Sequence, residues 1–543
     1  MFTACAAPAP APASEAPQVA QLLEGKQGLQ CDPGKEHWHA TTQPVRGGVL
    51  KKGLAAASAS ATLDMTTPGA TNTRIPQVYR HLVRPRSCYY EDTAVEPDMA
   101  KSWQTSPDGL TWTFSLRDDI KWHNKPPVNG RPFTAADVAW TIEMQKGGAQ
   151  LRTYWESITH EELNPSTVIL KLKDPDADFL GKLSENANVI FPHEVKEQFG
   201  DFKTAAVGTG PFMLKQSLAN QSTILERNPD WKEMGVDGKP LPYIDEVQAL
   251  VFEDYAAEVA AVRAGLLDVN SVFGFQKLDA DALVQSNPKL HPYKGIAGTV
   301  GGLYFNLTAK PYDDARIRKA FAFALNGDDI IEAGRQGGAV RSGFLPSGIQ
   351  DYAWSSDEAK EKFKQDPARA KQVLAEAGYG STPLEVTMET ATQYTQEAEV
   401  AQRQLQAAGV KVNISVQPGA STATIMGRKT FGFLYGVPTG ASYMVDRWFG
   451  APIRTGGSTN LLGLSDPQVD NLSVAQSREM DPARRKQIVR SLQDRLYDLM
   501  PWAPVSANIY YHFVSCQTQN LRPPHQTRNE EGMEAAWLNS AGC

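Results

Sequence analysis

The segment Tyr304–Leu325 places the strongest constraint on the fold of this chain. A short apolar run ends at Asn306, a Pro-containing turn follows, and apolar residues then recur at helical spacing. Asp313 or Asp314 stands where the N-cap of that helix is expected. The segment has no His, no Cys and no Gly-rich phosphate loop. We therefore expect it to be framework, a strand joined to a helix, and not a catalytic motif.

A second pattern of strand and helix lies within residues 96–146. The turn sequence SPDG at 106–109 precedes apolar residues that alternate along 110–116, which predicts a strand with one buried face. Thr134, with Asp137 three residues later, predicts the start of a helix. Short apolar runs and capped helices continue to alternate along the chain, which is typical of an α/β or α+β protein.

Together these motifs closely resemble the extracellular solute-binding proteins of family 5, the peptide, nickel and opine receptors of ABC importers. Segment 304–325 is similar to that family's pattern N-t-k-x-P-f-D-D, and residues 96–146 are similar to its pattern S-W…D-G…F-x-L-R…F-t-A-x-D-V. Further matches in the family's order are GTGPF at 208–212, NPDW at 228–231 and the stretch 258–272. The resemblance covers about residues 47 to 540.

The resemblance implies an α/β fold of two lobes, like a type II periplasmic binding protein, with an extra subdomain inserted in lobe I. The implied parts are a tether and irregular segment at 1–45, lobe I at 46–302 plus 500–543 with its subdomain near 84–206, and lobe II at 303–499. The chain would cross between the lobes at Thr299–Gly302 and at Met500–Pro504, where Gly and Pro residues suit a hinge.

The same resemblance implies the substrate-binding component of an ABC importer. Such a protein captures a small solute, here a peptide first of all, between its lobes and delivers it to the membrane permease. An oligosaccharide receptor of the same family is the nearest alternative, and a nickel or metal-chelate ligand comes third. A secreted hydrolase is the alternative from another class, and it would need a second carboxylate near Asp446. We expect a monomer without cofactor or catalytic residue, and the net charge of −7 argues against a nucleic-acid partner.

The candidate ligand site centres on Asp446, the only acidic residue between Val400 and Asp466. In peptide-binding members the corresponding loop carries an Asp that pairs with the ligand's α-ammonium, so the resemblance implies this role for Asp446. Arg447 would bind a ligand carboxylate. The family's pattern D-x-x-D-P-x-x-F is not intact here, which favours the oligosaccharide alternative. The other candidate ligand-binding residues are Tyr443, Trp448, Phe449, Met65, Thr66, Phe273, Phe275, Tyr304 and Asn306.

The chain has five cysteines, and their surroundings indicate an oxidising compartment. Cys5 follows a small residue and precedes an Ala/Pro tract, as in the maturation site of a bacterial lipoprotein. We therefore expect a lipid anchor at Cys5 and a location in the periplasm or on the outer face of the cell membrane. The other four cysteines allow three pairings. We favour Cys31 with Cys88 and Cys516 with Cys543, because each pair is local in sequence.

Motifs for covalent chemistry or metal binding are weak throughout the sequence. There is no G-x-S-x-G elbow and no H-E-x-x-H pair. His37-Trp38-His39 has the spacing of half a metal site, but it lies in the irregular N-terminal segment, so we expect no metal there. No uninterrupted apolar run reaches the roughly 18 residues of a membrane span.

Overall fold

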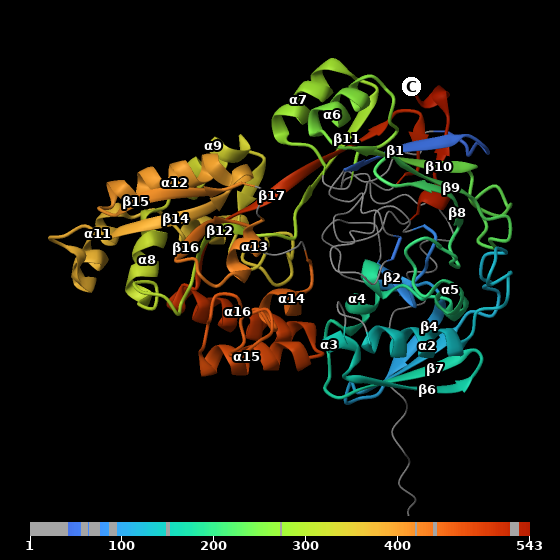
Figure 1. The fold of residues 1–543 in the computed structure, drawn as a ribbon, viewed down its shortest axis with the longest axis horizontal. Coiled ribbons are helices and arrows are strands. Elements are labelled where there is room, and N and C mark those ends of the chain that lie inside the picture. The colour runs from blue at the N-terminus through green and yellow to red at the C-terminus, as the bar shows by residue number, and fades with distance from the viewer. Residues whose placement is uncertain are drawn as a thin grey trace, which may run out of the picture.

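The structure, a computed structural model, describes residues 42–55, 63–64, 77–85, 95–147, 152–271, 274–418, 421–437, 442–521 and 532–543. Within these ranges the chain forms two lobes that lie side by side (Figure 1). Each lobe has its own sheets and its own large hydrophobic cluster. The tether up to residue 41, with Cys5 and Cys31, lies outside the described residues, and so does Cys88.

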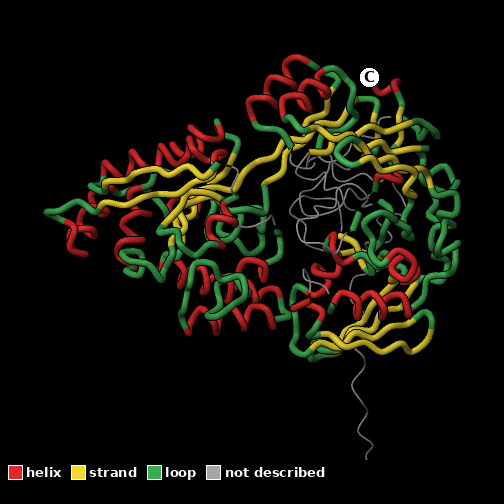
Figure 2. Tube along the Cα trace, viewed as in Figure 1, coloured by secondary structure: helices red, strands yellow, loops and turns green. Residues whose placement is uncertain are grey.

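Lobe I is built on two four-stranded sheets (Figure 2). The first has the order β1–β10–β9–β8, with β1 parallel to β10 and the other pairs antiparallel. The second belongs to the inserted subdomain, has the order β4–β5–β7–β6 and is antiparallel throughout. The strands are β1 (Val49–Ala55), β2 (Val83–Pro85), β3 (Val95–Pro97), β4 (Ala100–Thr105), β5 (Thr111–Leu116), β6 (Ile158–Asn164), β7 (Thr167–Leu172), β8 (Phe212–Leu218), β9 (Ser222–Arg227), β10 (Glu246–Phe252) and β11 (Leu290–Ile296). The helices are α2 (Ala135–Lys146), α3 (Arg152–Trp155), α4 (Phe179–Leu183), α5 (His193–Phe199), α6 (Tyr255–Arg263) and α7 (Lys277–Ser286).

The subdomain forms as its sequence pattern predicts. Along β5, Trp112, Phe114 and Leu116 are buried, and the residues between them are half-buried. The backbone N–H of Thr134 donates to the carboxylate of Asp137 at 2.9 Å, which fixes the start of α2. The alternation and the cap were both readable from sequence because each depends only on neighbouring residues.

Lobe II surrounds one mixed sheet that also takes in β11 of lobe I. Its order is β11–β17–β12–β16–β14–β15, and β13 pairs with β17. The strands are β12 (Gly301–Phe305), β13 (Ala339–Arg341), β14 (Glu385–Ala391), β15 (Lys411–Gln417), β16 (Phe433–Gly436) and β17 (Trp502–Ser515). The helices are α8 (Ala315–Ala324), α9 (Gly327–Arg335), α10 (Ser356–Lys362), α11 (Pro367–Leu374), α12 (Thr395–Ala407), α13 (Thr422–Gly427), α14 (Val445–Phe449), α15 (Pro467–Arg478) and α16 (Pro482–Leu499).

The segment Tyr304–Leu325 supplies the centre of lobe II. Strand β12 ends at Phe305, and the Asp314 carboxylate accepts the backbone N–H of Arg316 at 2.8 Å at the start of α8. The Phe305 ring lies among other aromatic rings, with its centroid 6.2 Å from Phe433 and 5.9 Å from Phe321. The expectation that this segment is framework is confirmed by its burial.

Strand β17 is shared between the two lobes. Its first part pairs with β12, and its second part, from Ile509 to Ser515, pairs with β11 (Figure 1). The sequence placed the return crossing at Met500–Pro504, but Met500 and Trp502 belong to the hydrophobic cluster of lobe II. The chain does not turn at Pro504, because β17 stays extended and the ladder opposite this proline is irregular. We place the return crossing inside the strand, near residues 507–509.

The C-terminus is tied back to lobe I. The short strands β18 (Thr518–Gln519) and β19 (Trp537–Leu538) pair antiparallel. Cys516, which precedes these strands, and Cys543, which follows them, form a disulfide. This is the pairing that proximity in sequence favoured. The bond closes the chain between the end of β17 and the last residue.

Candidate functional site

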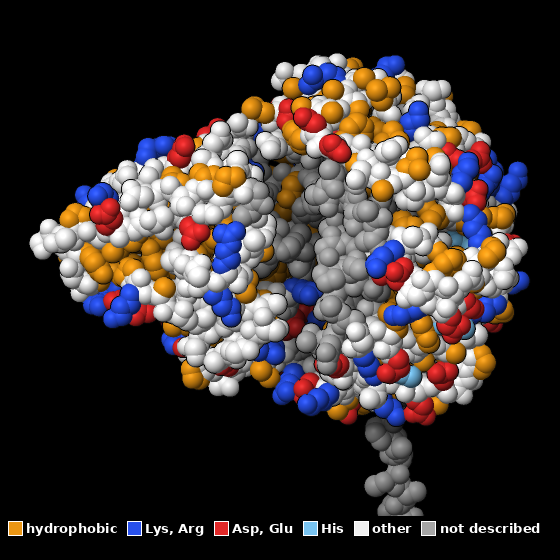
Figure 3. Space-filling view, viewed as in Figure 1, with side chains coloured by type: hydrophobic (Ala, Val, Ile, Leu, Met, Phe, Trp, Pro, Cys, Tyr) orange, Lys and Arg blue, Asp and Glu red, His pale blue; other side chains and the backbone are white. Residues whose placement is uncertain are grey.

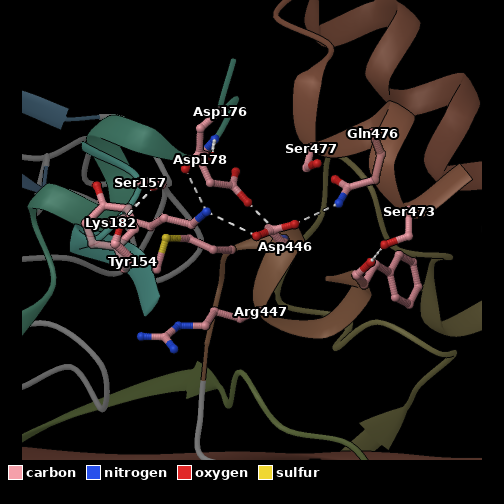
Figure 4. A network of polar contacts seen from close by, with 12 residues as sticks. Tyr154, Ser157, Asp176, Asp178, Lys182, Asp446, Arg447, Ser473, Gln476 and Ser477 are labelled. Carbon is pink, nitrogen blue, oxygen red and sulfur yellow. Dashed lines mark hydrogen bonds and ion pairs between the residues drawn. The ribbon is translucent and has the colours of Figure 1, made fainter. Parts of the chain in front are cut away.

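Asp446, the centre of the predicted ligand site, lies in the first turn of α14 and faces the other lobe (Figure 4). Its Oδ2 lies 3.0 Å from Nζ of Lys182, which belongs to α4 of lobe I. Its Oδ1 accepts a hydrogen bond of 3.2 Å from Nε2 of Gln476, and Arg454 lies 3.6 Å away. Both carboxylate oxygens are therefore already engaged by groups of the chain.

The ammonium of Lys182 is held by three groups at once. Its Nζ lies 3.0 Å from Asp446, 2.8 Å from Oδ2 of Asp176 and 5.7 Å from the ring centroid of Tyr154. Burial alone would lower the pKa of Lys182, but the charges of Asp446 and Asp176 raise it above its ordinary value. The side chain is 15% exposed, so it stays charged in a site largely removed from water.

A second pair of charges lies deeper, between Asp178 and Arg485. Oδ1 of Asp178 lies 2.6 Å from the Arg485 guanidinium, which also donates to Oε1 of Gln476. Oδ2 of Asp178 accepts the backbone N–H of Asp446 at 2.8 Å. Although burial would raise the pKa of Asp178, the charge and hydrogen bond of Arg485 hold it below its ordinary value. This pair joins the loop before α4 to helix α16 across the lobes.

Two outer pairs flank these contacts. The guanidinium of Arg447 donates to both carboxylate oxygens of Glu185, at 3.2 and 2.6 Å. Arg478 lies 2.7 Å from Asp174. We call the charged residues that meet here the interlobe cluster, namely Asp174, Asp176, Asp178, Lys182 and Glu185 from lobe I and Asp446, Arg447, Arg478 and Arg485 from lobe II. Basic and acidic side chains gather side by side where the lobes meet, low in the view of Figure 3.

A cavity of about 170 Å³ opens beside the interlobe cluster. Both lobes line it. Lobe I contributes Tyr154, Asp176 and Lys182, and lobe II contributes Asp446 and Arg454. It is smaller than the roughly 300–1,000 Å³ of typical small-molecule sites.

The aromatic candidates around Asp446 are core residues. Tyr443, Trp448 and Phe449 are each at most 5% exposed and belong to the hydrophobic cluster of lobe II. The Trp448 indole N–H donates to the carbonyl of Ser442, and the Tyr443 hydroxyl donates to the carbonyl of Ile296. Their ligand-binding role stays a prediction, and in this structure their rings pack inside the protein while their polar atoms donate to its backbone.

The candidate ligand-binding residues on or next to strands also make their contacts within the protein. Tyr304 is 3% exposed, stacks on Trp502 and donates its hydroxyl to the carbonyl of Val300. The Asn306 side chain closes its own turn by accepting from Thr308. Phe275 is 1% exposed. Met65, Thr66 and Phe273 lie outside the described residues. The ligand-binding role of Tyr304, Asn306 and Phe275 therefore stays a prediction, because a strand sequence alone does not tell a cleft-facing side chain from a core-facing one.

Sequence reasoning missed the lobe I half of the interlobe cluster. Its signal was present in residues 174–185, DPDADFLGKLSE, where acidic residues crowd around one lysine. Their partners Arg478 and Arg485 lie some 300 positions later, at separations of 304 and 307. Contacts at such separations leave no trace in local periodicity.

Neither a metal centre nor a membrane helix is found in the part of the chain that the structure describes. No group of three His, Cys, Asp or Glu side chains there is placed to hold a metal ion. No helix there is both long enough and apolar enough to cross a bilayer. His37-Trp38-His39 lies outside these residues.

The model of family 5 of the bacterial extracellular solute-binding proteins (middle region) matches residues 94–459, more than half of the chain. The chain belongs to this family. Members are solute-binding proteins outside the cytoplasm, and the predicted membership is confirmed. The match covers the inserted subdomain, lobe II up to residue 459 and both sides of the interlobe cluster around Lys182 and Asp446.

This family 5 protein is similar to curated relatives in other bacteria. A Brucella ovis protein described as an ABC transporter peptide-binding protein is 30% identical over 318 residues, which are 53% of this chain and 54% of the relative. The chain thus spans about half the length of that relative. The glutathione-binding protein GsiB of Salmonella typhimurium is 26% identical over 455 residues, which are 79% of this chain and 83% of the relative.

Solved structures carry the same fold. The periplasmic binding protein DppA of Helicobacter pylori, in complex with the peptide STSA, matches with a TM-score of 0.74. The match covers 91% of this chain and 99% of DppA at 22% sequence identity. The oligopeptide-binding protein AppA of Bacillus subtilis, in complex with a nonapeptide, matches with a TM-score of 0.71 at 19% identity. The expected two-lobe fold is therefore confirmed.

Proposed function

We propose that this protein is the substrate-binding component of an ABC importer and that it captures a peptide between its lobes. The observation that carries the proposal is the family 5 match over residues 94–459 on a two-lobe fold. Two lobes that share β17 and meet at the interlobe cluster can separate and close around a solute. Affinity would come from burying most of the ligand surface on closure.

A peptide is the ligand class that the relatives favour. The Brucella ovis and Salmonella typhimurium relatives carry peptide and glutathione in their names. We do not assign the ligand's α-ammonium to Asp446, because Lys182 and Gln476 already occupy its two carboxylate oxygens. A ligand amine would have to displace one charge-assisted contact to make another, with little net gain in free energy.

The proposed role includes no covalent chemistry. Asp176 and Asp178 do lie beside Asp446, which is the carboxylate neighbourhood that the hydrolase alternative requires. However, Lys182 bridges Asp446 and Asp176, and Arg485 neutralises Asp178. With each carboxylate paired beside a cavity of about 170 Å³, the arrangement suits an ion-pair network better than an acid and a base flanking a sugar.

The proposed partners follow from the same role. The receptor would dock on the permease subunits of its importer and act as a monomer. It would work outside the cytoplasm, anchored through a lipid on Cys5. Mass spectrometry of Cys5 in membrane fractions tests the anchor, and an unmodified thiol there would remove that part of the proposal.

A thermal-shift screen of ligand-stripped protein tests the ligand class. The panel contains glutathione, peptides of two to nine residues, malto-oligosaccharides and a nickel–histidine chelate. A peptide present at 100 times its Kd should stabilise the protein by about 2.7 kcal/mol and raise the melting temperature accordingly. A shift with a sugar and none with any peptide would establish the oligosaccharide alternative. Cleavage of a panel compound, followed by mass spectrometry, would instead show an enzyme.

A further inference from the structure

The interlobe cluster contains a complete ammonium-binding site that the chain fills with its own lysine. Two carboxylates and one aromatic face surround Nζ of Lys182, namely Asp446, Asp176 and Tyr154. This combination of anionic oxygens and a ring is how proteins recognise a cationic amine. The Tyr154 hydroxyl is buried beside it and has no hydrogen-bond partner among the described residues.

The two carboxylates that hold Lys182 come from different lobes. Asp176 belongs to lobe I, like Lys182 itself, while Asp446 belongs to lobe II. The strong contact between Lys182 and Asp446 therefore exists only when the lobes are together. Opening the lobes would return both charges to water.

Neighbouring contacts also hold the two lobes together. The backbone N–H of Ala177 donates to the carbonyl of Ser477 at 2.8 Å, and Met444 packs against Gly181. Among the residues that the structure describes, four ion pairs cross the interface, Asp174–Arg478, Asp178–Arg485, Lys182–Asp446 and Glu185–Arg447. Every charge named in the interlobe cluster thus has a partner of opposite sign.

We propose that Lys182 is an internal ligand, a latch that holds the lobes closed before any solute binds. The latch needs no particular ligand, since every group in it belongs to the chain, and its test is therefore separate from that of the proposed function. It also defines a resting state, because a protein with a populated closed form must open before it admits a solute.

Small-angle scattering of ligand-stripped protein tests the latch. Lys182→Ala should raise the radius of gyration, as the ratio of closed to open molecules falls by about tenfold or more. Asp446→Asn keeps the shape of the side chain and removes its charge, and it should have the same effect. The matched control is Lys171→Ala, because Lys171 pairs with Glu161 on the neighbouring strand and both side chains are half-exposed. This control should leave the radius unchanged.

Chemical rescue distinguishes the latch from a loss of packing. Lys182→Ala lacks the three carbons and the amine that n-propylammonium can restore, whereas n-propanol restores the volume without the charge. Propylammonium should return the variant to the radius of the unmodified protein, and propanol should not. Three results would overturn the proposal: Lys182→Ala stays closed, Asp446→Asn stays closed, or propanol rescues as well as the amine. Unchanged far-ultraviolet circular dichroism shows that each variant is folded.

Discussion

The guanidinium of Arg485 lies 2.6 Å from the carboxylate of Asp178, although the two residues belong to different lobes. Their side chains are 5% and 9% exposed, which makes this the most enclosed of the contacts between the lobes. Removing one partner of such a pair leaves the other as an uncompensated buried charge. The pair should therefore be the energetic centre of the interface.

Arg485→Met should destabilise the closed protein by about 3–5 kcal/mol, because it leaves Asp178 as a buried carboxylate without its compensating charge. Differential scanning calorimetry should show a lower melting temperature, and scattering should show a larger radius. Arg478→Met is the matched control, since Arg478 and Asp174 are both about half exposed. It should cost at most about 1 kcal/mol. Equal losses of stability in the two variants would contradict the larger contribution expected from the pair of Asp178 and Arg485.

Stability should fall as the pH drops from about 6.5 towards about 4. The His123 ring accepts the backbone N–H of Gly208 and donates to the carbonyl of Gly210, so it is built in as a neutral imidazole. Burial lowers its pKa to about 4, against about 6.5 in the unfolded chain. Between these values the unfolded state binds more protons, so folding stability decreases with falling pH.

Calorimetry across this pH range in the His123→Gln variant checks the assignment. The variant should have a shallower acid slope than the unmodified protein, while His81 and His512, whose pKa values burial lowers to about 4 and about 3, keep part of the slope. An identical dependence of stability on pH in both proteins would show that His123 does not contribute to the acid destabilisation.

Loss of the disulfide should loosen the C-terminus. Cys516 and Cys543 are 27 residues apart, and closing a loop of that size stabilises a folded chain by about 3.5 kcal/mol in the chain-entropy model. Cys516→Ser should therefore lower the melting temperature, and dithiothreitol should lower it at least as much in the unmodified protein, because it would also reduce the bond expected between Cys31 and Cys88. An unchanged melting temperature in Cys516→Ser would contradict this role of the bond.

Gly302→Ala should destabilise lobe II at its junction with lobe I. A Cβ at Gly302 would lie 2.2 Å from the backbone carbonyl oxygen of Ala503 on the neighbouring strand. Backbone cannot move aside as a flexible side chain would, so we expect a loss of about 1–3 kcal/mol. Gly427→Ala is the control, since a Cβ there meets no atom within 4 Å. Denaturant unfolding measures the stability of both variants. Similar midpoints would contradict the expected clash between a Cβ at Gly302 and the carbonyl oxygen of Ala503.

The framework was largely readable from the sequence because its signals are local. Asp366 and Asp481 each precede a Pro and cap α11 and α16, as their residue types predict. The alternation of β5 likewise needed only six residues. The return crossing at Met500–Pro504 stays a prediction, because Pro504 is usual after a helix yet is also compatible with the extended strand β17.

The role of the site was harder to predict because it depends on which side chains contact each other in the folded protein. Asp446 was singled out from the sequence as an isolated acid, but its partner Lys182 is 264 positions away. The residue type fitted two chemistries equally well, an ammonium on a ligand and an ammonium on the chain itself. Only the folded arrangement distinguishes them.

The sharing of β17 between the lobes has a consequence for how the protein is made. The strand lies between β11 and β12 in the sheet, yet it begins at Trp502, near the end of the chain. During synthesis β11 of lobe I and β12 of lobe II cannot pair with β17 until the last part of the chain has left the ribosome. The edges of β11 and β12 that face β17 therefore stay unpaired until late in synthesis, and the sheet that joins the two lobes forms in one late step.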